Sequence, residues 1–278
     1  MSNLTQAIIL AGGRGTRLAE QTYQLPKPLV RVGNIPIIVH IINHLASYGV
    51  EHIVIAGGYK VEMIRDYFTS DEFKNQGESL KIEADGTVST KGSILPKGLK
   101  SIQIVDTGLN TGTAHRIEKA QKYLPEPNEP FFMTYGDTVS DVNLEKVSDL
   151  FFKSDARLII TAVPYKERFG ILKVDPNSNN LVTKFAEKST SKDEFVNGGF
   201  MAMDSKAIAY IFPEDDDFSK DTLPRMQQSG VINAYVHTGF WAAMDTQRDN
   251  EELNELYDEK PELFKRAEKE NDLTWNFN

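Results

Sequence analysis

A loop rich in glycine and arginine near the start of the chain has the composition of a phosphate-binding loop. It follows residues 7–11, a short apolar run that is typical of a strand buried on both faces. Glycines at positions 12, 13 and 15 remove side chains where backbone N–H groups must approach anionic oxygens. Arg14 and Arg17 add positive charge, and the Arg17 guanidinium can donate to two phosphate oxygens. The two arginines favour phosphate binding over the simpler alternative, a tight turn between a strand and a helix.

Two common nucleotide-binding patterns do not fit this loop. A dinucleotide-binding fingerprint that starts at Gly13 needs a third glycine where the chain has Leu18. A P-loop needs Lys-Ser or Lys-Thr at a set distance from its first glycine, and neither pair follows there. The loop is therefore not expected to belong to a dinucleotide-dependent oxidoreductase or to a P-loop kinase.

A lysine held between two prolines follows about ten residues later. Each ring of Pro26 and Pro28 fixes its own φ and biases the preceding residue toward extended geometry. Lys27 is therefore expected on a stiff backbone, where its charge can meet a developing negative charge without reorganisation. Taken alone, the residue could equally be a solvated loop lysine.

Two aspartates, far apart in the sequence, each follow an apolar run. Asp137 closes the run at residues 131–135, and Asp245 comes after residues 240–244. A carboxylate at the carboxyl end of a parallel strand points into the crevice where ligands bind. Two hard oxygen ligands completed by phosphate oxygens and water suit Mg²⁺. Taken singly, either residue could instead be an ordinary strand-end or N-cap aspartate.

An alternation of strands and helices is expected to place these residues at strand ends. Apolar runs and helical spacing predict strands over 7–11, 52–56, 101–105, 131–135 and 158–163 and helices over 35–48, 113–123 and 251–269, the last interrupted by Pro261. The order strand, helix, strand is the unit of a parallel sheet. The polar segment 72–98 is expected to form a hairpin or a long excursion. Shorter β segments are expected at 170–174, 181–185, 200–203 and 233–236. The fold class predicted is α/β, with a Rossmann-like mixed, mainly parallel sheet flanked by helices and a small β-rich C-terminal elaboration.

The composition excludes several classes of protein. The 278 residues include 31 Lys plus Arg against 40 Asp plus Glu, a formal charge of -9 that argues against a broad nucleic-acid surface. Cysteine is absent, so disulfides and thiolate metal sites are excluded. No apolar run approaches the length of a membrane span, and the first residues lack the pattern of a secretory signal. A cytoplasmic protein without nucleic-acid or membrane partners is expected.

Two histidines are a rival candidate for a metal site. His40 and His44 are one helical turn apart, so a metal pair is conceivable. No third ligand is near them in the sequence, and a packed helix with two partly exposed histidines is the better interpretation. His237 has no recognisable context.

The loop and the lysine together resemble the signature of the sugar-phosphate nucleotidyltransferases, the nucleoside-diphosphate-sugar pyrophosphorylases. The resemblance implies that the loop binds a nucleoside triphosphate, that Arg17 and Lys27 are the catalytic cations on its phosphates, and that Asp137 and Asp245 hold Mg²⁺. The nucleotide-binding residues implied are Leu10, Ala11, Gly12, Gly13, Arg14, Gly15, Thr16, Thr111, Gly112 and Asp137. The substrate-binding residues implied on the sugar side are Arg168, Gly170, Glu187, Lys188 and Asn197. The chain has Ser189 where the family often has proline.

Within this family, the likeness is greatest to members that transfer a cytidylyl group from CTP to glucose 1-phosphate. It covers about residues 6–248 and implies one domain over residues 1–278, with a nucleotide-binding half (about 1–145), a sugar-phosphate-binding half (about 146–250) and a helical C-terminal tail (251–278). The alternatives are another nucleoside triphosphate, another phosphorylated acceptor, or a regulatory domain that binds nucleotide without catalysis. A homo-oligomer is expected, although the charged C-terminal helix could also be a solvated face.

Overall fold

The computed structural model shows a mixed β-sheet flanked by helices. The described residues are 4–15, 24–70, 80–82, 88–90, 98–166, 171–175, 181–186, 190–215 and 217–264. Within them, one sheet has ten strands: β13-β10-β14-β8-β1-β4-β7-β6-β5, with β15 paired to β10. The strands are β1 (Gln6–Ala11), β4 (His52–Gly57), β5 (Leu80–Ile82), β6 (Val88–Thr90), β7 (Ser101–Asp106), β8 (Phe131–Tyr135), β10 (Leu158–Lys166), β13 (Thr190–Asn197), β14 (Met201–Met203) and β15 (Ile232–Val236).

The centre of this sheet is parallel, as the βαβ pattern predicts. Strand β1 pairs in parallel with β4 on one side and with β8 on the other, and β4 pairs in parallel with β7. Antiparallel strands lie to either side: β14 pairs with β8, and the β5–β6 hairpin extends β7. Within the polar segment 72–98, the described strands therefore form a hairpin, one of the two forms that the sequence predicts, and this hairpin continues the sheet. The predicted α/β fold class, a mixed sheet flanked by helices, is confirmed.

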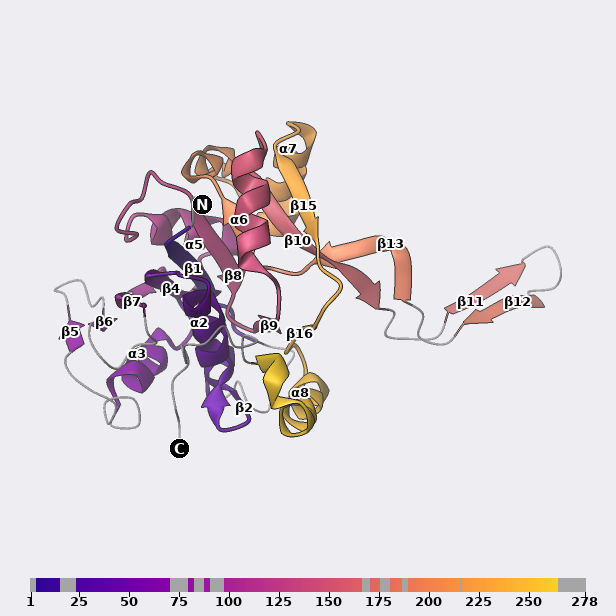
Figure 1. The fold of residues 1–278 in the computed structure, drawn as a ribbon, viewed down its shortest axis with the longest axis horizontal. Helices are drawn as coiled ribbons and strands as arrows, with labels where there is room; N and C mark the ends of the chain where they lie inside the picture. Colours follow the sequence, from indigo (N-terminus) through magenta and orange to yellow (C-terminus); the bar gives the residue numbers. More distant parts are fainter. Residues whose placement is uncertain are drawn as a thin grey trace.

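Helices cover both faces of the sheet, which explains the continuous apolar runs of its central strands (Figure 1). Alternate residues of β1 belong to two separate cores: Ala7 and Ile9 to one, Ile8 and Leu10 to the other. The first core includes residues from α2, α3, α6 and α8, and the second includes residues from α5 and α7. The helices are α2 (Ile37–Ser47), α3 (Val61–Thr69), α5 (Thr113–Gln121), α6 (Leu144–Lys153), α7 (Leu223–Gln228) and α8 (Gln247–Glu259). Among the described residues, no helix is both long and apolar enough to cross a bilayer.

Several element boundaries differ from the predicted ones. The helix expected from residue 35 begins at Ile37, because Ile35–Pro36 forms strand β3 and pairs with β2 (Arg31–Val32). The C-terminal helix begins at Gln247, before the predicted start at residue 251, because Thr246 and Asp249 form a capping box there. Helices α3 and α6 were not predicted; both are short and carry fewer apolar residues than α2.

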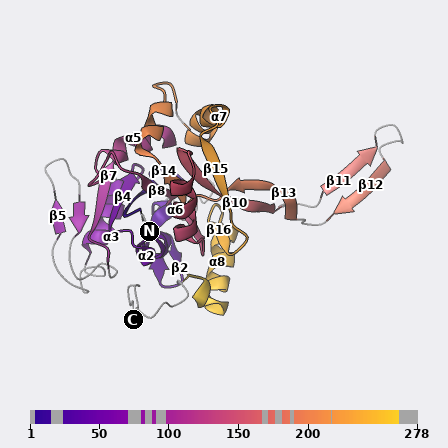
Figure 2. The same cartoon turned by 45° about the horizontal axis from the view of Figure 1, so that its top comes forward.

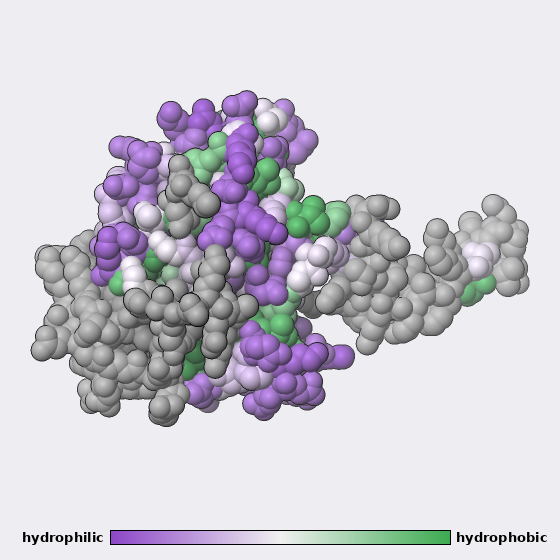
Figure 3. Space-filling model, viewed as in Figure 1, coloured by the Kyte–Doolittle hydropathy of each residue, from purple (hydrophilic) through white to green (hydrophobic). Residues whose placement is uncertain are grey.

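The second half of the chain adds strands to the main sheet and also sends out an arm. Strand β14 pairs with β8, and β10, β13 and β15 extend the sheet beyond β14. The β segments expected at 170–174 and 181–185 form the antiparallel hairpin β11 (Ile171–Asp175) and β12 (Leu181–Ala186). This hairpin projects from the body in both cartoon views (Figures 1 and 2). Apolar surface lies beside the base of the arm (Figure 3). Tyr165 of β10, Phe195 of β13 and Val236 of β15 are exposed apolar side chains.

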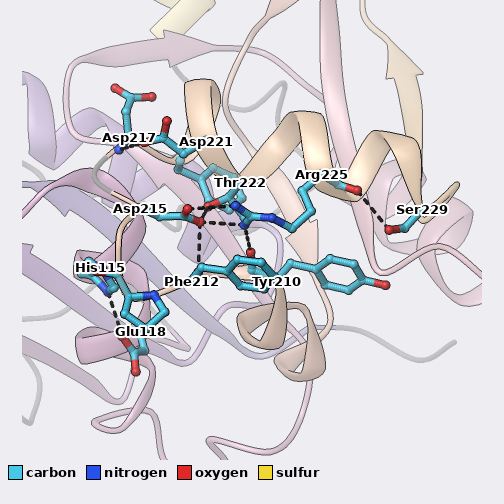
Figure 4. A network of polar contacts seen from close by, with 12 residues as sticks. His115, Glu118, Tyr210, Phe212, Asp215, Asp217, Asp221, Thr222, Arg225 and Ser229 are labelled. Atoms are coloured by element: carbon cyan, nitrogen blue, oxygen red, sulfur yellow. Dashed lines mark hydrogen bonds and ion pairs between the residues drawn. The ribbon is translucent and has the colours of Figure 1, made fainter.

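An ion pair between the buried Asp215 and the partly exposed Arg225 anchors the segment between β14 and β15. Asp215 accepts hydrogen bonds from both terminal nitrogens of Arg225 at 2.8 and 3.0 Å, and from the Thr222 hydroxyl at 2.9 Å (Figure 4). The guanidinium of Arg225 also lies 3.7 Å from the ring centroid of Phe212. The Arg225 hydrogen bonds hold the pKa of Asp215 well below its usual range. The pair joins α7 to the 3-10 helix Ser205–Tyr210 through the Tyr210 carbonyl.

Replacing Asp215 by asparagine is expected to lower the free energy of unfolding by about 2 kcal/mol, because a charge-assisted bidentate contact is lost. The pKa of Asp215 is depressed in the folded state, so its contribution is present above the unfolded-state pKa of about 4 and declines as the pH falls below it. Urea unfolding at pH 7 and pH 3 measures both effects. The stability gap between wild type and Asp215→Asn should shrink at pH 3, and an unchanged gap would contradict this reading of the pair.

Candidate active site

Lys27 brings the two predicted aspartates together. Its Nζ atom lies 2.6 Å from Oδ2 of Asp137 and 2.7 Å from Oδ1 of Asp245. Lys27 is buried, whereas the two carboxylates keep 28% and 33% of their side-chain exposure, so solvent and a ligand can reach them. Burial alone lowers the pKa of Lys27, but the charges and hydrogen bonds of Asp137 and Asp245 outweigh it and raise the pKa above 10.5. The lysine is therefore a fixed cation between two carboxylates.

The sequence predicts extended geometry for Lys27, because it precedes Pro28, but the structure places Lys27 at the start of a helical turn. Pro26 caps a short 3-10 helix, Lys27–Leu29, and Pro28 is its second residue. The backbone N–H of Val30 closes the turn on the Lys27 carbonyl at 3.1 Å. The β2–β3 hairpin follows directly and is tied to α8, since Asn250 donates to the Arg31 carbonyl at 2.9 Å. The lysine backbone is thus held from both sides.

A two-stranded ribbon carries the two aspartates. Strand β9 (Thr138–Ser140) starts directly after Asp137 and pairs antiparallel with β16 (Trp241–Ala243), which ends two residues before Asp245. The N–H of Met244 donates to the Asp137 carbonyl at 2.9 Å, so the pairing continues to the site. Asp249 then accepts from the N–H groups of Asp245 and Thr246 at 2.9 and 2.8 Å. The helix cap therefore fixes the backbone of Asp245.

The glycine loop lies over a buried arginine that the sequence did not single out. Arg116 of α5 is 4% exposed and donates to the carbonyls of Gly57 and Gly12 at 2.9 and 3.1 Å and to the Thr107 hydroxyl at 2.6 Å. A Cβ atom at Gly12 or at Gly58 would stand 2.2 Å from its Nη1 atom. A side chain at position 12 would therefore have to displace the Arg116 guanidinium from these hydrogen bonds, independently of any phosphate. The sign that could have pointed to Arg116 is a charged residue on the apolar face of a helix.

The rest of the loop faces outward. Gly13 is exposed, and a Cβ atom built on it meets nothing within 4 Å. Gly15 has a φ of 60°, a left-handed conformation that glycine adopts without strain. Arg14 donates from Nη2 to Oδ1 of Asn110 at 3.0 Å, which joins the loop to the segment before α5. In that segment Thr111 donates to the Thr107 carbonyl, and Gly112 is the N-cap of α5.

Asn197 lies across β8 from the glycine loop, in contact with a tyrosine. Its Nδ2 atom donates to the hydroxyl of Tyr135 at 3.3 Å, and its Oδ1 accepts from the N–H of Gly199 at 3.0 Å. The Tyr135 hydroxyl is also 3.5 Å from Oγ of Ser219. Burial raises the pKa of Tyr135, so its phenol is neutral and can both donate and accept. Tyr135 and Ser219 were not predicted as site residues.

Several predicted site residues cannot be placed. Thr16, Arg17, Arg168, Gly170, Glu187 and Lys188 lie outside the described residues. The residues that the structure brings together are Lys27, Asp137 and Asp245 at one point, and Gly12, Arg14 and the Thr111–Gly112 segment around Arg116.

The histidine pair of α2 has a packing role. Nε2 of His40 lies 2.9 Å from the Val32 carbonyl and that of His44 lies 3.0 Å from the Val142 carbonyl, so both nitrogens are donors. His40 is 5% exposed, which corrects the expectation that both are partly exposed, and burial lowers its pKa to about 4. Among the described residues, no group of three or more histidine, aspartate or glutamate side chains is arranged to hold a metal ion.

Comparison with known proteins identifies relatives along almost the whole chain. The family model described as "Nucleotidyl transferase" matches residues 6–263. A probable glucose-1-phosphate cytidylyltransferase of Bacillus subtilis is 34% identical over 94% of this chain and 99% of its own length. Glucose-1-phosphate cytidylyltransferase of Salmonella typhi is 31% identical over 91% and 96%. A mannose-1-phosphate guanyltransferase of Aspergillus oryzae is 26% identical over 88% of this chain and 62% of its own length.

Solved structures share the fold at lower sequence identity. HddC from Yersinia pseudotuberculosis superimposes with a TM-score of 0.65 at 24% identity and covers 91% of this chain and 100% of its own. UTP-bound UGPase from Acinetobacter baumannii gives a TM-score of 0.68 at 16% identity, with coverages of 94% and 96%. These likenesses support the Rossmann-like fold class.

Proposed function

Since the chain belongs to the nucleotidyl transferase family, we propose that it transfers a cytidylyl group from CTP to a sugar 1-phosphate, with glucose 1-phosphate favoured, and releases pyrophosphate. The observation that carries the proposal is the contact of Lys27 with both Asp137 and Asp245. Three residues from distant parts of the chain converge beside the glycine loop, which is the arrangement that nucleotidyl transfer needs. The relatives at 34% and 31% identity support the choice of nucleotide and acceptor.

The two aspartates fit a magnesium ion. One oxygen from each carboxylate points at the same cation, the Lys27 ammonium, and both side chains are partly exposed. Mg²⁺ keeps several waters and takes one or two carboxylates plus substrate phosphates, so a pair of aspartates suffices. Bound there, the metal would neutralise charge on the α-phosphate and the leaving pyrophosphate. Asp137 and Asp245 are the residues that would hold it.

The chemistry requires positioning and charge neutralisation more than acid–base catalysis. An oxygen of the sugar 1-phosphate forms a bond to the α-phosphorus, while the bond from that phosphorus to the β-phosphate oxygen breaks and pyrophosphate leaves. The attacking phosphate is already anionic, so no general base is needed. Lys27 has three N–H donors, of which two are directed at carboxylates, and its charge offsets the charge that develops in transfer. The outward Gly13 side of the loop is where phosphates approach.

The choice of base and acceptor is the finer part of the proposal. Relatives named as mannose-1-phosphate guanyltransferases match 88–93% of the chain at 26–28% identity, below the cytidylyltransferases. CTP and glucose 1-phosphate are therefore the first pair, and GTP with mannose 1-phosphate is the second.

A panel of substrates tests the proposal directly. The protein is incubated with MgCl₂, each of CTP, UTP, GTP and dTTP, and each of glucose 1-phosphate and mannose 1-phosphate, and pyrophosphate release is measured. CTP with glucose 1-phosphate is expected to give the highest kcat/KM, and EDTA is expected to abolish release. A higher kcat/KM for another pair of nucleotide and acceptor would change the proposed specificity, and the proposed reaction type would stand. No pyrophosphate from any pair would reject catalysis and favour a regulatory nucleotide-binding domain.

A further inference from the structure

A histidine–aspartate pair lies at the far end of the ribbon that carries the two site carboxylates. Nε2 of His237 is 3.0 Å from Oδ1 of Asp141, and the histidine side chain is 8% exposed. Asp141 follows β9 directly, just as Asp137 precedes it. The ribbon has three residue pairs, so its two ends are about 10 Å apart at about 3.3 Å per residue. The pair is therefore on the element that carries the two carboxylates, at the end of that element away from them.

The hydrogen bonds of this pair converge on one carbonyl. The Phe240 carbonyl accepts from Nε2 of His237 at 3.1 Å, from the Ser140 hydroxyl at 2.7 Å and from the Asp141 N–H at 3.1 Å. A carbonyl and a carboxylate can only accept, so Nε2 of His237 carries a proton and donates to both. His237 itself is fixed by its backbone N–H, which donates to Ala162 of β10 at 2.9 Å. The ribbon end is thereby tied to the main sheet.

The main chain is shaped to bring these groups together. A Cβ atom at Gly239 would stand 2.6 Å from Oδ1 of Asp141 and 2.8 Å from Cε1 of His237. Only a glycine leaves the space that the pair occupies. At the same end, Nε1 of Trp241 donates to the Gly198 carbonyl at 2.8 Å, which connects the ribbon to the segment that holds Asn197.

We propose that His237 and Asp141 are positioning residues that set the register and spacing of the β9–β16 ribbon, and thereby the separation of Asp137 and Asp245. This inference rests on the proposed function, in which those two carboxylates hold the metal. A two-stranded ribbon of three pairs is marginal by itself, so its pairing depends on what fixes its ends. A slip of one residue would turn the side chains to opposite faces and separate the carboxylates. The helix cap at Asp249 fixes one end, and the His237–Asp141 pair fixes the other.

The test measures metal binding to the whole protein as well as turnover. Mn²⁺ is titrated into the protein in the presence of CTP, and the EPR signal of free Mn²⁺ is followed. The Mn²⁺ that wild type binds in excess of Asp245→Ala, both with CTP, is assigned to the proposed site. His237→Ala and Asp141→Ala are each expected to weaken this uptake about tenfold, within the range known for partners of metal ligands. His237→Gln, whose amide N–H can replace Nε2–H, is expected to stay within about twofold of wild type. Asp149→Ala, which removes an exposed aspartate of α6, is the matched control and should change nothing.

The outcomes separate this inference from the proposed function. If wild type takes up no more Mn²⁺ than Asp245→Ala, the proposed metal site fails and this inference fails with it. If wild type takes up Mn²⁺ and His237→Ala takes up as much, the positioning role alone is overturned. A melting temperature lowered equally in His237→Ala and His237→Gln, with Mn²⁺ affinity unchanged in both, would also overturn it, because that is the signature of a purely structural residue.

Discussion

Replacing Lys27 by alanine is expected to lower the rate of nucleotidyl transfer by about 10²–10³-fold, the usual cost of losing one pre-organised charged donor. The buried ammonium is fixed between Asp137 and Asp245 and sits on a backbone that Pro26 and Pro28 stiffen. It needs no reorganisation when negative charge develops on the transferred phosphate. Steady-state pyrophosphate release with CTP and glucose 1-phosphate measures the loss, which should fall mainly on kcat.

The same substitution should change how the protein responds to metal. Without the ammonium, no cation lies between the two carboxylates. A divalent ion then no longer competes with Lys27 for them and is expected to bind more strongly. The melting temperature of Lys27→Ala is therefore expected to rise more with added MgCl₂ than that of wild type. Lys27→Arg is the control for charge alone: its planar guanidinium cannot occupy the place of a compact ammonium, so it should stay well below wild-type rate. Near-normal turnover of Lys27→Ala would reject the catalytic assignment.

The meeting of Lys27, Asp137 and Asp245 shows what the sequence can predict about this site. Each aspartate follows an apolar run, and the carboxyl ends of the parallel strands β1 and β8 lie at one edge of the sheet. Because Asp137 follows β8 and the glycine loop follows β1, the two are expected to lie close together, regardless of the length of chain between them. Asp245 follows because β16 pairs with β9, although periodicity could not detect a ribbon of three-residue strands. The sequence shows only that Asp245 follows an apolar run, and the resemblance implies its role beside Asp137; the ribbon is the physical reason that the two lie together.

Residues whose role depends on distant parts of the chain could not be found in this way. Arg116 lies on the face of α5 that also carries Ile117 and Ala120, but only the packing of α5 against β1 and β4 shows which loop carbonyls it contacts. His237 and Asp141 are almost a hundred positions apart, and their contact depends on the turn at Gly239. Short-range patterns predict strands and buried runs well because these are local. Buried polar contacts between distant segments leave no periodic trace.

Gly12 and Gly13 illustrate the difference between local patterns and distant contacts, because the two residues have different roles. The sequence offers one reason for both, close approach of backbone to phosphate. In the structure, Gly12 is buried and leaves space for the Arg116 guanidinium, whereas Gly13 is exposed with open space before it. Neither has the positive φ that only glycine tolerates easily, so an alanine at either position meets only what surrounds its Cβ atom. The two alanine variants can therefore separate folding from ligand binding.

Gly12→Ala is expected to destabilise the protein by about 3 kcal/mol, because the new methyl group displaces a buried arginine from its hydrogen bonds. For a chain of this size, that corresponds to a fall of about 10 °C in melting temperature. Gly13→Ala is expected to melt within about 2 °C of wild type, since its methyl group enters empty space and the change also lowers the entropy of the unfolded chain. Its affinity for CTP should nevertheless fall at least about tenfold, because phosphates that approach the loop backbone would meet the methyl group.

Thermal melting and calorimetric CTP titration of the two variants decide between the roles. Gly12→Ala paired with Arg116→Ala is informative, since removal of the guanidinium makes room for the methyl group. The double variant should therefore be less destabilised than the sum of the two single changes, by more than the roughly 0.5 kcal/mol within which independent sites add. If Gly12→Ala is as stable as wild type, the space at Gly12 is not held by Arg116. If Gly13→Ala keeps full CTP affinity, phosphates do not approach that side of the loop, and the nucleotide must enter from the Asn110–Gly112 side.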